Sequence, residues 1–296
     1  MDQVPAIIGD VAALALGASV GSFAVTVAYR LPRDISIATP RSFCESCERP
    51  VPWWANIPIF AYLASRGRCL MCGAPIRARH LGGELALALA ALYLYANFPL
   101  GDAIARFIFV TALLISSLVD YDWRLIPNLI TFPGVPVGFV LAALFIPEVG
   151  WKSSLIGIIA GGGVLFATGF IYQLVRAKEG VGLGDVFLLA MIGAFIGWQG
   201  VLFTLFFGAL LGSFGGLAIG LFGTPTQAPE LPPGMREATA AAAASITPPA
   251  APDSAAAENE EHALLATAVP FGPFLSLAAG FYALFQPQLA SWYLSR

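Results

Sequence analysis

Charged residues are what this sequence has least of. Asp, Glu, Lys and Arg together make up 11% of the 296 residues, hydrophobic residues make up 58%, and the mean hydropathy is +0.78. A soluble globular domain carries charge on about a quarter of its residues, so the composition excludes an ordinary soluble domain. The net charge of −3 does not favour binding to nucleic acid, and we expect no nucleic-acid partner.

Other features are also scarce. The two histidines, His80 and His262, are expected to be interfacial and loop residues rather than ligands. No glycine-rich nucleotide fingerprint marks a cofactor pocket. The first apolar run carries the acids Asp2 and Asp10 where a signal peptide would have basic residues, so we expect a retained helix rather than a cleavable signal.

Long apolar runs are abundant instead. Because a helix needs about 20 apolar residues to cross a bilayer, they predict an all-α polytopic membrane protein with about eight transmembrane helices, of which the sixth is short. The predicted spans are Pro5–Tyr29, Leu81–Phe98, Ala103–Val119, Leu129–Ile146, Ser153–Val175, Asp185–Trp198, Val201–Phe222 and Pro270–Tyr293.

The basic residues predict the orientation. If the segment from Arg30 to Arg79 is cytoplasmic and the spans alternate, only Arg106, Lys152 and Arg296 of the 15 Lys and Arg residues fall near the other face. Such a bias follows the positive-inside rule. The cytoplasmic arginines also have the charge to contact anionic lipid headgroups.

The chain divides into five predicted parts. A first transmembrane helix (1–29) is followed by a hydrophilic module (30–80) and a transmembrane core (81–222), and a last transmembrane helix occupies 264–296. Between core and last helix, residues 223–263 are rich in Pro and Ala and are predicted to be a disordered cytoplasmic loop, because this composition cannot bury a core.

The four cysteines all lie in the hydrophilic module, as two Cys-x-x-Cys pairs about twenty residues apart: Cys44, Cys47, Cys69 and Cys72. Each pair can place two thiolates on one metal ion through a tight turn. Structural disulfides are not expected in a reducing cytoplasm. We therefore predict a structural Zn²⁺ site, since four thiolates leave no open position for catalysis.

Two acids border apolar runs. Gly182-Leu183-Gly184-Asp185 precedes an uncharged stretch, and Asp120 closes another. An acid within the membrane costs about 2.5–3.5 kcal/mol and is usually functional. Two carboxylates held close share about one proton and can divide acid and base roles, as in aspartic proteases. Gly182 and Gly184 would let a substrate backbone approach Asp185, and Asp122 is predicted to be a solvated loop acid.

Taken together, these motifs resemble the bacterial type IV prepilin peptidases, membrane aspartic proteases with a Gly-x-Gly-Asp motif. The resemblance covers most of the chain outside the Pro-rich loop. The matching stretches are Gly21–Phe23, Tyr29–Pro32, both cysteine pairs, Asn56–Pro58, Arg66–Cys69, Pro75-Ile76, Glu84, Asp120, Ile126-Pro127, Leu129–Thr131, Gly182–Asp185 and Pro270–Pro273.

The resemblance implies a bacterial inner-membrane enzyme that cleaves the leader of type IV prepilins or pseudopilins after a glycine, on the cytoplasmic side. It also implies N-methylation of the new N-terminus with S-adenosylmethionine as donor. Asp120 and Asp185 would be the catalytic acids, and the four cysteines would bind zinc. Glu84 would serve methyl transfer or, as an acid at a helix N-terminus, only stability.

Three positions depart from the family pattern. Asn128 replaces an acid, Val186-Phe187 replaces Phe-Lys after the second catalytic acid, and Arg79-His80-Leu81 replaces Arg-Tyr-Pro. A proton-coupled transporter with paired intramembrane aspartates is an alternative, although both acids lie at helix ends and no inverted repeat is visible. A zinc scaffold without catalysis would require the loss of one acid. The particular prepilins and the oligomeric state stay open.

Overall fold

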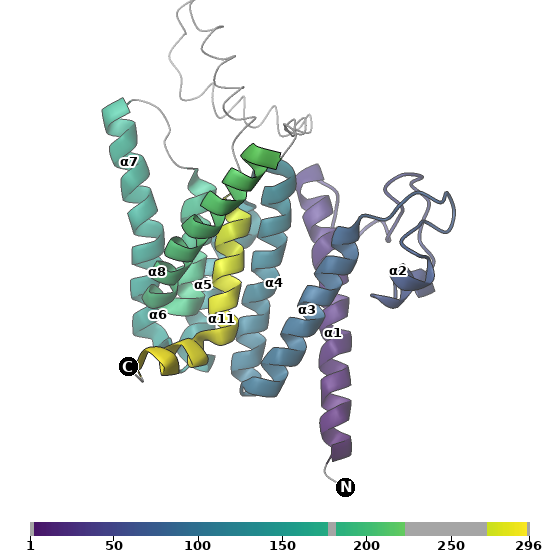
Figure 1. Ribbon diagram of the computed structural model, residues 1–296, viewed down its shortest axis with the longest axis horizontal. Helices are drawn as coiled ribbons and strands as arrows, with labels where there is room; N and C mark the ends of the chain where they lie inside the picture. The colour runs from purple at the N-terminus through teal and green to yellow at the C-terminus, as the bar shows by residue number, and fades with distance from the viewer. Residues whose placement is uncertain (1–2, 177–181, 223–270, 295–296) are drawn as a thin grey trace, which may run out of the picture.

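The computed structural model describes residues 3–176, 182–222 and 271–294, and this part of the chain is helical without a β-strand. The long helices lie side by side as a bundle, and a small module projects from one end of it, next to α1 and α3 (Figure 1). The elements are α1 (Gln3–Arg30), η1 (Leu31–Arg33), η2 (Trp53–Asn56), α2 (Phe60–Ala64), α3 (Ala78–Asn97), α4 (Leu100–Trp123), α5 (Asn128–Phe145), α6 (Gly150–Ile158), the π-helical turn η3 (Ile159–Gly163), α7 (Val164–Arg176), α8 (Leu183–Phe222) and α11 (Gly272–Leu294).

Five described segments are long and apolar enough to cross a membrane, which confirms a polytopic membrane protein in its coarse form. They are Ile7–Arg33, Leu100–Trp123, Asn128–Phe145, Gly150–Tyr172 and Leu183–Leu217. The predicted number of eight spans remains an expectation. The predicted loop 223–263 lies outside the described residues.

Two helices are bent at identifiable positions. Gly197 interrupts α8 with a non-helical backbone (φ 71°, ψ −179°). It lies within the predicted sixth span, four residues before the start of the predicted seventh. In α11, Pro287 stands inside the helix, and the C-terminal part turns away from the bundle axis (Figure 1). Both residue types break the regular hydrogen-bond ladder.

Small residues allow the helices to approach closely. A Cβ atom on Gly17 or Gly21 of α1 would lie 2.5–2.6 Å from the carbonyl oxygens of Leu87 and Gly83 in α3. Membrane helices use such positions because packing, rather than the hydrophobic effect, drives their association. The N-terminal pair α1 and α3 is therefore in backbone-to-backbone contact.

A buried apolar cluster joins α4, α8 and α11. Phe109 stacks on Phe195 at a centroid distance of 4.7 Å, and Leu188, Met191 and Leu275 are fully buried beside them. This cluster sets the relative positions of the three helices. Their ends carry the acidic site described next.

Candidate active site

Asp120 lies in the last turn of α4 and is 6% exposed. Its Oδ2 atom accepts a hydrogen bond of 2.9 Å from the backbone N–H of Gly272, at the start of α11. Two segments separated by 152 residues in the sequence therefore meet at this carboxylate.

Asp185 lies in the first turn of α8 and is partly buried. It is close enough to Asp120 for the two carboxylates to repel each other. Among the described residues, no hydrogen-bond donor reaches the Asp185 side chain. The structure thus brings together the two acids that the sequence singled out, in unequal surroundings.

The two motif glycines differ in what surrounds them. A Cβ atom on Gly184 would lie 2.9 Å from the Cβ of Ile126, so this glycine lets α8 pack against the link between α4 and α5. Gly182 is exposed, and a Cβ there would lie 3.7 Å from the Asp185 Oδ2 atom, at ordinary contact distance. Packing therefore requires a glycine at 184, whereas no contact with the described residues requires one at 182.

The four cysteines converge in the module. Their ligand atoms all lie within 4.8 Å of one another. Backbone N–H groups of Cys72 and Met71 lower the pKa of the Cys69 thiol to about 6, whereas burial and the three neighbouring thiols raise the pKa of the Cys72 thiol to about 11. Four sulfur donors gathered around one point are what a tetrahedral Zn²⁺ site uses, so the residues fit a metal ion.

The two cysteine pairs lie in matching turns. The backbone N–H of the first cysteine bonds the carbonyl five residues on, at Arg49 and Ala74, and an antiparallel bridge encloses each turn, Phe43 with Pro50 and Arg68 with Pro75. The fourth residue after the first cysteine has positive φ in both, 56° at Glu48 and 71° at Gly73. Only the second of these two positions is occupied by a glycine.

A cavity of about 400 Å³ separates the module from the ends of α1 and α3. Its wall includes Ser22, Thr26, Tyr29, Glu45, His80 and Glu84. Glu84 is 7% exposed, and its Oε2 atom accepts a 2.6 Å hydrogen bond from the N–H of Ile59. Ile59 has a φ of 64°, which is rare for a β-branched residue, so Glu84 helps to hold a strained turn of the module.

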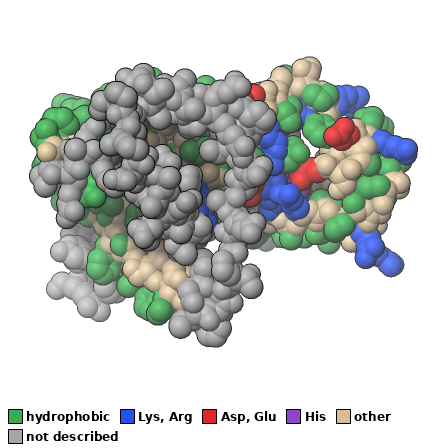
Figure 2. Space-filling view, turned by 90° about the horizontal axis from the view of Figure 1, so that it is seen from above, with side chains coloured by type: hydrophobic (Ala, Val, Ile, Leu, Met, Phe, Trp, Pro, Cys, Tyr) green, Lys and Arg blue, Asp and Glu red, His purple; other side chains and the backbone are tan. Residues whose placement is uncertain are grey.

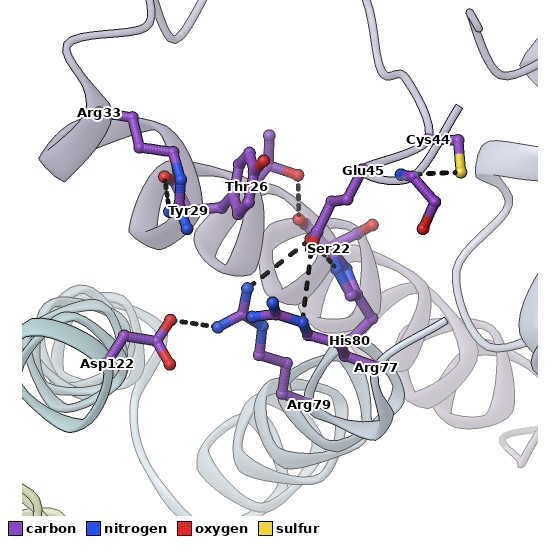
Figure 3. Close-up of polar contacts among 11 residues, drawn as sticks. Ser22, Thr26, Tyr29, Arg33, Cys44, Glu45, Arg77, Arg79, His80 and Asp122 are labelled. Carbon is purple, nitrogen blue, oxygen red and sulfur yellow. Dashed lines mark hydrogen bonds and ion pairs between the residues drawn. The ribbon is translucent and has the colours of Figure 1, made fainter. Parts of the chain in front are cut away.

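The prediction that Asp122 is a solvated loop acid is wrong. Asp122 is the penultimate residue of α4, its side chain is 22% exposed, and it pairs with Arg79 of α3. Arg79 lies between Asp122 and Glu45 of the module, beside His80 (Figure 3). The hydrogen bond with His80 and the charges of Arg77 and Arg79 hold the pKa of the Glu45 carboxyl below its ordinary value.

Arginines also attach the module to α1. Arg30 is 3% exposed, and its guanidinium donates to the backbone carbonyls of Ser36, Pro40 and Arg41. Seen from the end of the bundle that carries the module, basic side chains gather over this region (Figure 2). The sequence pointed to topology and to headgroup contact for these residues, and the structure adds a tethering role.

One buried ionic network was missed by sequence reasoning. Arg106 is 1% exposed and bonds Asp102 within α4, Glu148 in the segment that follows α5, and both the Ala283 carbonyl and Gln286 of α11. Sequence analysis treated Arg106 only as a charge near the other face. The i,i+4 spacing of Asp102 and Arg106 was a signal for an intrahelical pair, but not for the tie to α11.

Comparisons with known proteins agree on one family. Residues 15–98 match the model of the bacterial peptidase A24 N-terminal domain, and residues 107–217 match that of the type IV leader peptidase family. The prepilin leader peptidase/N-methyltransferase of Burkholderia pseudomallei (strain 1026b) is 34% identical over 240 residues, covering 72% of this chain and 75% of the relative.

Proteins of the same name in Myxococcus xanthus (strain DK1622) and Pseudomonas aeruginosa are similar over nearly the whole chain. The first is 30% identical over 301 residues, covering 93% of this chain and 90% of the relative. The second is 28% identical over 303 residues, covering 94% and 91%. No solved structure matches the chain significantly.

Proposed function

This chain belongs to the type IV leader peptidase family, and we propose that it is a membrane-embedded aspartic endopeptidase. Its substrates are type IV prepilins or pseudopilins, cleaved on the cytoplasmic side of the bacterial inner membrane after a glycine. We further propose that the enzyme methylates the new N-terminus. The observation that carries the peptidase proposal is the meeting of Asp120 and Asp185 at one site.

The chemistry of a carboxylate pair supports this activity. Two acids close enough to repel each other do not both ionise cheaply, so the pair holds about one proton near neutral pH. The ionised member can take a proton from water as its oxygen attacks a peptide carbonyl, and the protonated member can donate to the carbonyl oxygen. No covalent intermediate is needed.

The apolar surroundings of the site support a membrane-inserted substrate. A cavity of about 720 Å³ runs between α3, α4, α8 and α11, lined by apolar side chains such as Leu113, Leu114 and Phe207. Ser117, in the same lining, lies one helical turn before Asp120. An apolar helix in this cavity would have its cytoplasmic end next to the carboxylates.

The central test is the replacement of each acid by its amide. We expect Asp120→Asn and Asp185→Asn each to abolish leader cleavage of a purified prepilin, read as product mass, because neither half of the pair can replace the other. Asp122→Asn is the matched control, since this acid also lies near the end of α4 but pairs with Arg79. Near-normal cleavage by either variant of the pair would refute the assignment.

For methyl transfer, we propose that S-adenosylmethionine binds in the cavity of about 400 Å³ between the module and the ends of α1 and α3. This volume suits a small-molecule ligand, and the wall combines the carboxylate of Glu84 with arginines and aromatic rings. The bound donor would supply a transferable methyl group. Glu84 would orient the new amine and accept its proton, and the amine exists only after the leader is cut.

Two variants of Glu84 separate this role from stability. Glu84→Gln keeps an oxygen that can accept the Ile59 N–H but removes the charge, whereas Glu84→Ala removes both. We expect Glu84→Gln to cut the leader normally and yield a product that lacks the mass of the methyl group. Donor binding, measured directly by calorimetry with S-adenosylhomocysteine, should weaken as well. Methylation at the wild-type rate would assign Glu84 to packing alone.

We also propose that the four cysteines, Cys44, Cys47, Cys69 and Cys72, hold a structural Zn²⁺ ion. The clustering of their ligand atoms supports this proposal. Residues 30–80 and 81–222 would then form two functional units. The first would depend on the metal for its fold, and the second would carry the peptidase acids.

A further inference from the structure

The first turn of α11 has a single backbone N–H group that the helix itself does not satisfy. Phe274 and Leu275 donate to the carbonyl of Phe271, and Pro273 has no N–H to donate. The remaining group belongs to Gly272, and it donates to the Oδ2 atom of Asp120 at 2.9 Å. Because buried backbone N–H groups are almost always paired, Asp120 completes the start of α11.

This contact also requires that residue 272 have no side chain. A Cβ atom at Gly272 would lie 2.5 Å from Asp120 Oδ2 and 3.0 Å from its Cγ. Real Cβ atoms do not approach an oxygen so closely, so any side chain at position 272 would move the carboxylate off the amide. Asp185 has no comparable donor among the described residues.

We infer that Gly272 is a positioning residue that holds Asp120 as the ionised member of the pair. A backbone N–H aimed at a carboxylate oxygen favours the charged form, and the N-terminal end of a helix favours a negative charge in the same way. Asp120 is then the base and Asp185 the acid. This inference rests on the proposed peptidase function and divides the roles within it.

The reaction can be written with this division. The Asp120 carboxylate takes a proton from water as the water oxygen bonds to the peptide carbonyl carbon, and Asp185 gives its proton to the carbonyl oxygen. In the second step Asp120 returns its proton to the amide nitrogen as the C–N bond breaks, and Asp185 takes a proton from one hydroxyl of the tetrahedral carbon. One water is consumed, and both carboxyl groups are restored.

A second contact between the two helices, at the middle of α11, keeps this one in register. Arg106 of α4 donates to the carbonyl of Ala283 in α11 at 2.6 Å, and both residues are buried. Apolar packing of Leu275 and Ala279 against α4 and α8 fills the space between. Gly272 therefore lies on a helix that is bonded to α4 at two points, Asp120 and Arg106.

Kinetics with two glycine variants test the positioning role. In Gly272→Ala we expect kcat for leader cleavage to fall on the order of 100-fold with KM unchanged, the cost of a small displacement of a catalytic group. Gly82→Ala in α3 is the control, because a Cβ there would meet nothing within 4 Å and Gly82 lines neither cavity. Equal kcat in the two variants, or a loss confined to KM, would overturn the inference.

Infrared spectroscopy tests the division of roles. The C=O stretch of the protonated carboxyl group, followed with pH in each single variant as a difference from the double variant Asp120→Asn/Asp185→Asn, should disappear at a lower pH in Asp185→Asn, which keeps Asp120, than in Asp120→Asn, which keeps Asp185. Equal midpoints, or the reverse order, overturn the assignment. Full cleavage by the single Asn variants would instead refute the peptidase function itself, so the two failures are distinguishable.

Discussion

The cysteine module and the helical bundle are stabilised in different ways. Between residues 34 and 77 the only buried residue is Gly67, so the module has almost no hydrophobic core. In the bundle, by contrast, every residue from Leu188 to Ile196 is buried. The module depends on its cysteine turns and on tethers from the buried Arg30 and Glu84, whereas the bundle depends on close packing between helices.

This difference indicates which region responds to which perturbation. If the module holds the proposed Zn²⁺, removing the metal should unfold the module and leave the bundle intact, because a bound metal would replace the missing core. Changing the volume or charge of a buried residue should affect the bundle and leave metal binding intact.

The largest effect should come from the metal. Apparent binding energies of structural zinc reach about 10–16 kcal/mol, so Ser at positions 44, 47, 69 and 72 should unfold the module. We expect about one Zn²⁺ per chain by elemental analysis in the wild type and none in this variant. Limited proteolysis should cut between 34 and 77 while residues 100–145 stay protected. Zinc retained by the Ser variant would show that the site is wrong.

Next in size is the buried charge of Arg106. Arg106→Leu leaves Asp102 without its partner in a buried position, and breaking a buried ion pair costs about 3–5 kcal/mol. The thermal unfolding midpoint of the detergent-solubilised protein should fall, and the zinc content should not change. Lys152→Leu, at an exposed position, is the control. A loss of zinc in Arg106→Leu would break the division between module and bundle.

A smaller effect should separate the two motif glycines. Gly184→Ala places a Cβ 2.9 Å from that of Ile126, and such overpacking costs about 1–3 kcal/mol. Cleavage should drop because the first turn of α8 carries Asp185. Gly182→Ala should be tolerated for stability, since its Cβ has ordinary contact distances. If only Gly182→Ala raises KM, the close approach of the substrate backbone explains why position 182 is a glycine. Equal destabilisation by the two substitutions would contradict the packing argument for Gly184.

The smallest effect lies inside the module, at the paired turn positions. Gly73→Ala must adopt a φ of 71° although nothing crowds its Cβ, which costs about 1–2 kcal/mol for a residue with a side chain. Glu48→Gly should stabilise the other turn, because Glu48 already has a φ of 56°. Chelator titration of bound zinc measures both. An unchanged midpoint in both variants would show that turn strain does not limit metal binding.

Much of the helical fold was predictable because it depends on local composition. Apolar runs predicted a polytopic helical protein, and all the long described helices overlap predicted spans. The spacing of the cysteine pairs predicted that they would meet, because a Cys-x-x-Cys turn brings its two sulfurs together on its own. Asp122 was misjudged for the opposite reason: its partner Arg79 lies 43 residues away and enters from another helix.

For the acidic site, the pattern along the chain singled out the two acids, since an acid bordering an apolar run stands out by its cost. How the surroundings of those acids differ depends on the packing of the helices. The hydrogen bond from Gly272 to Asp120 spans 152 residues, and the contacts of Arg106 with α11 span 177 and 180. Contacts between residues so far apart in the sequence depend on how the helices pack, so neither the periodicity nor the composition of the chain predicts them.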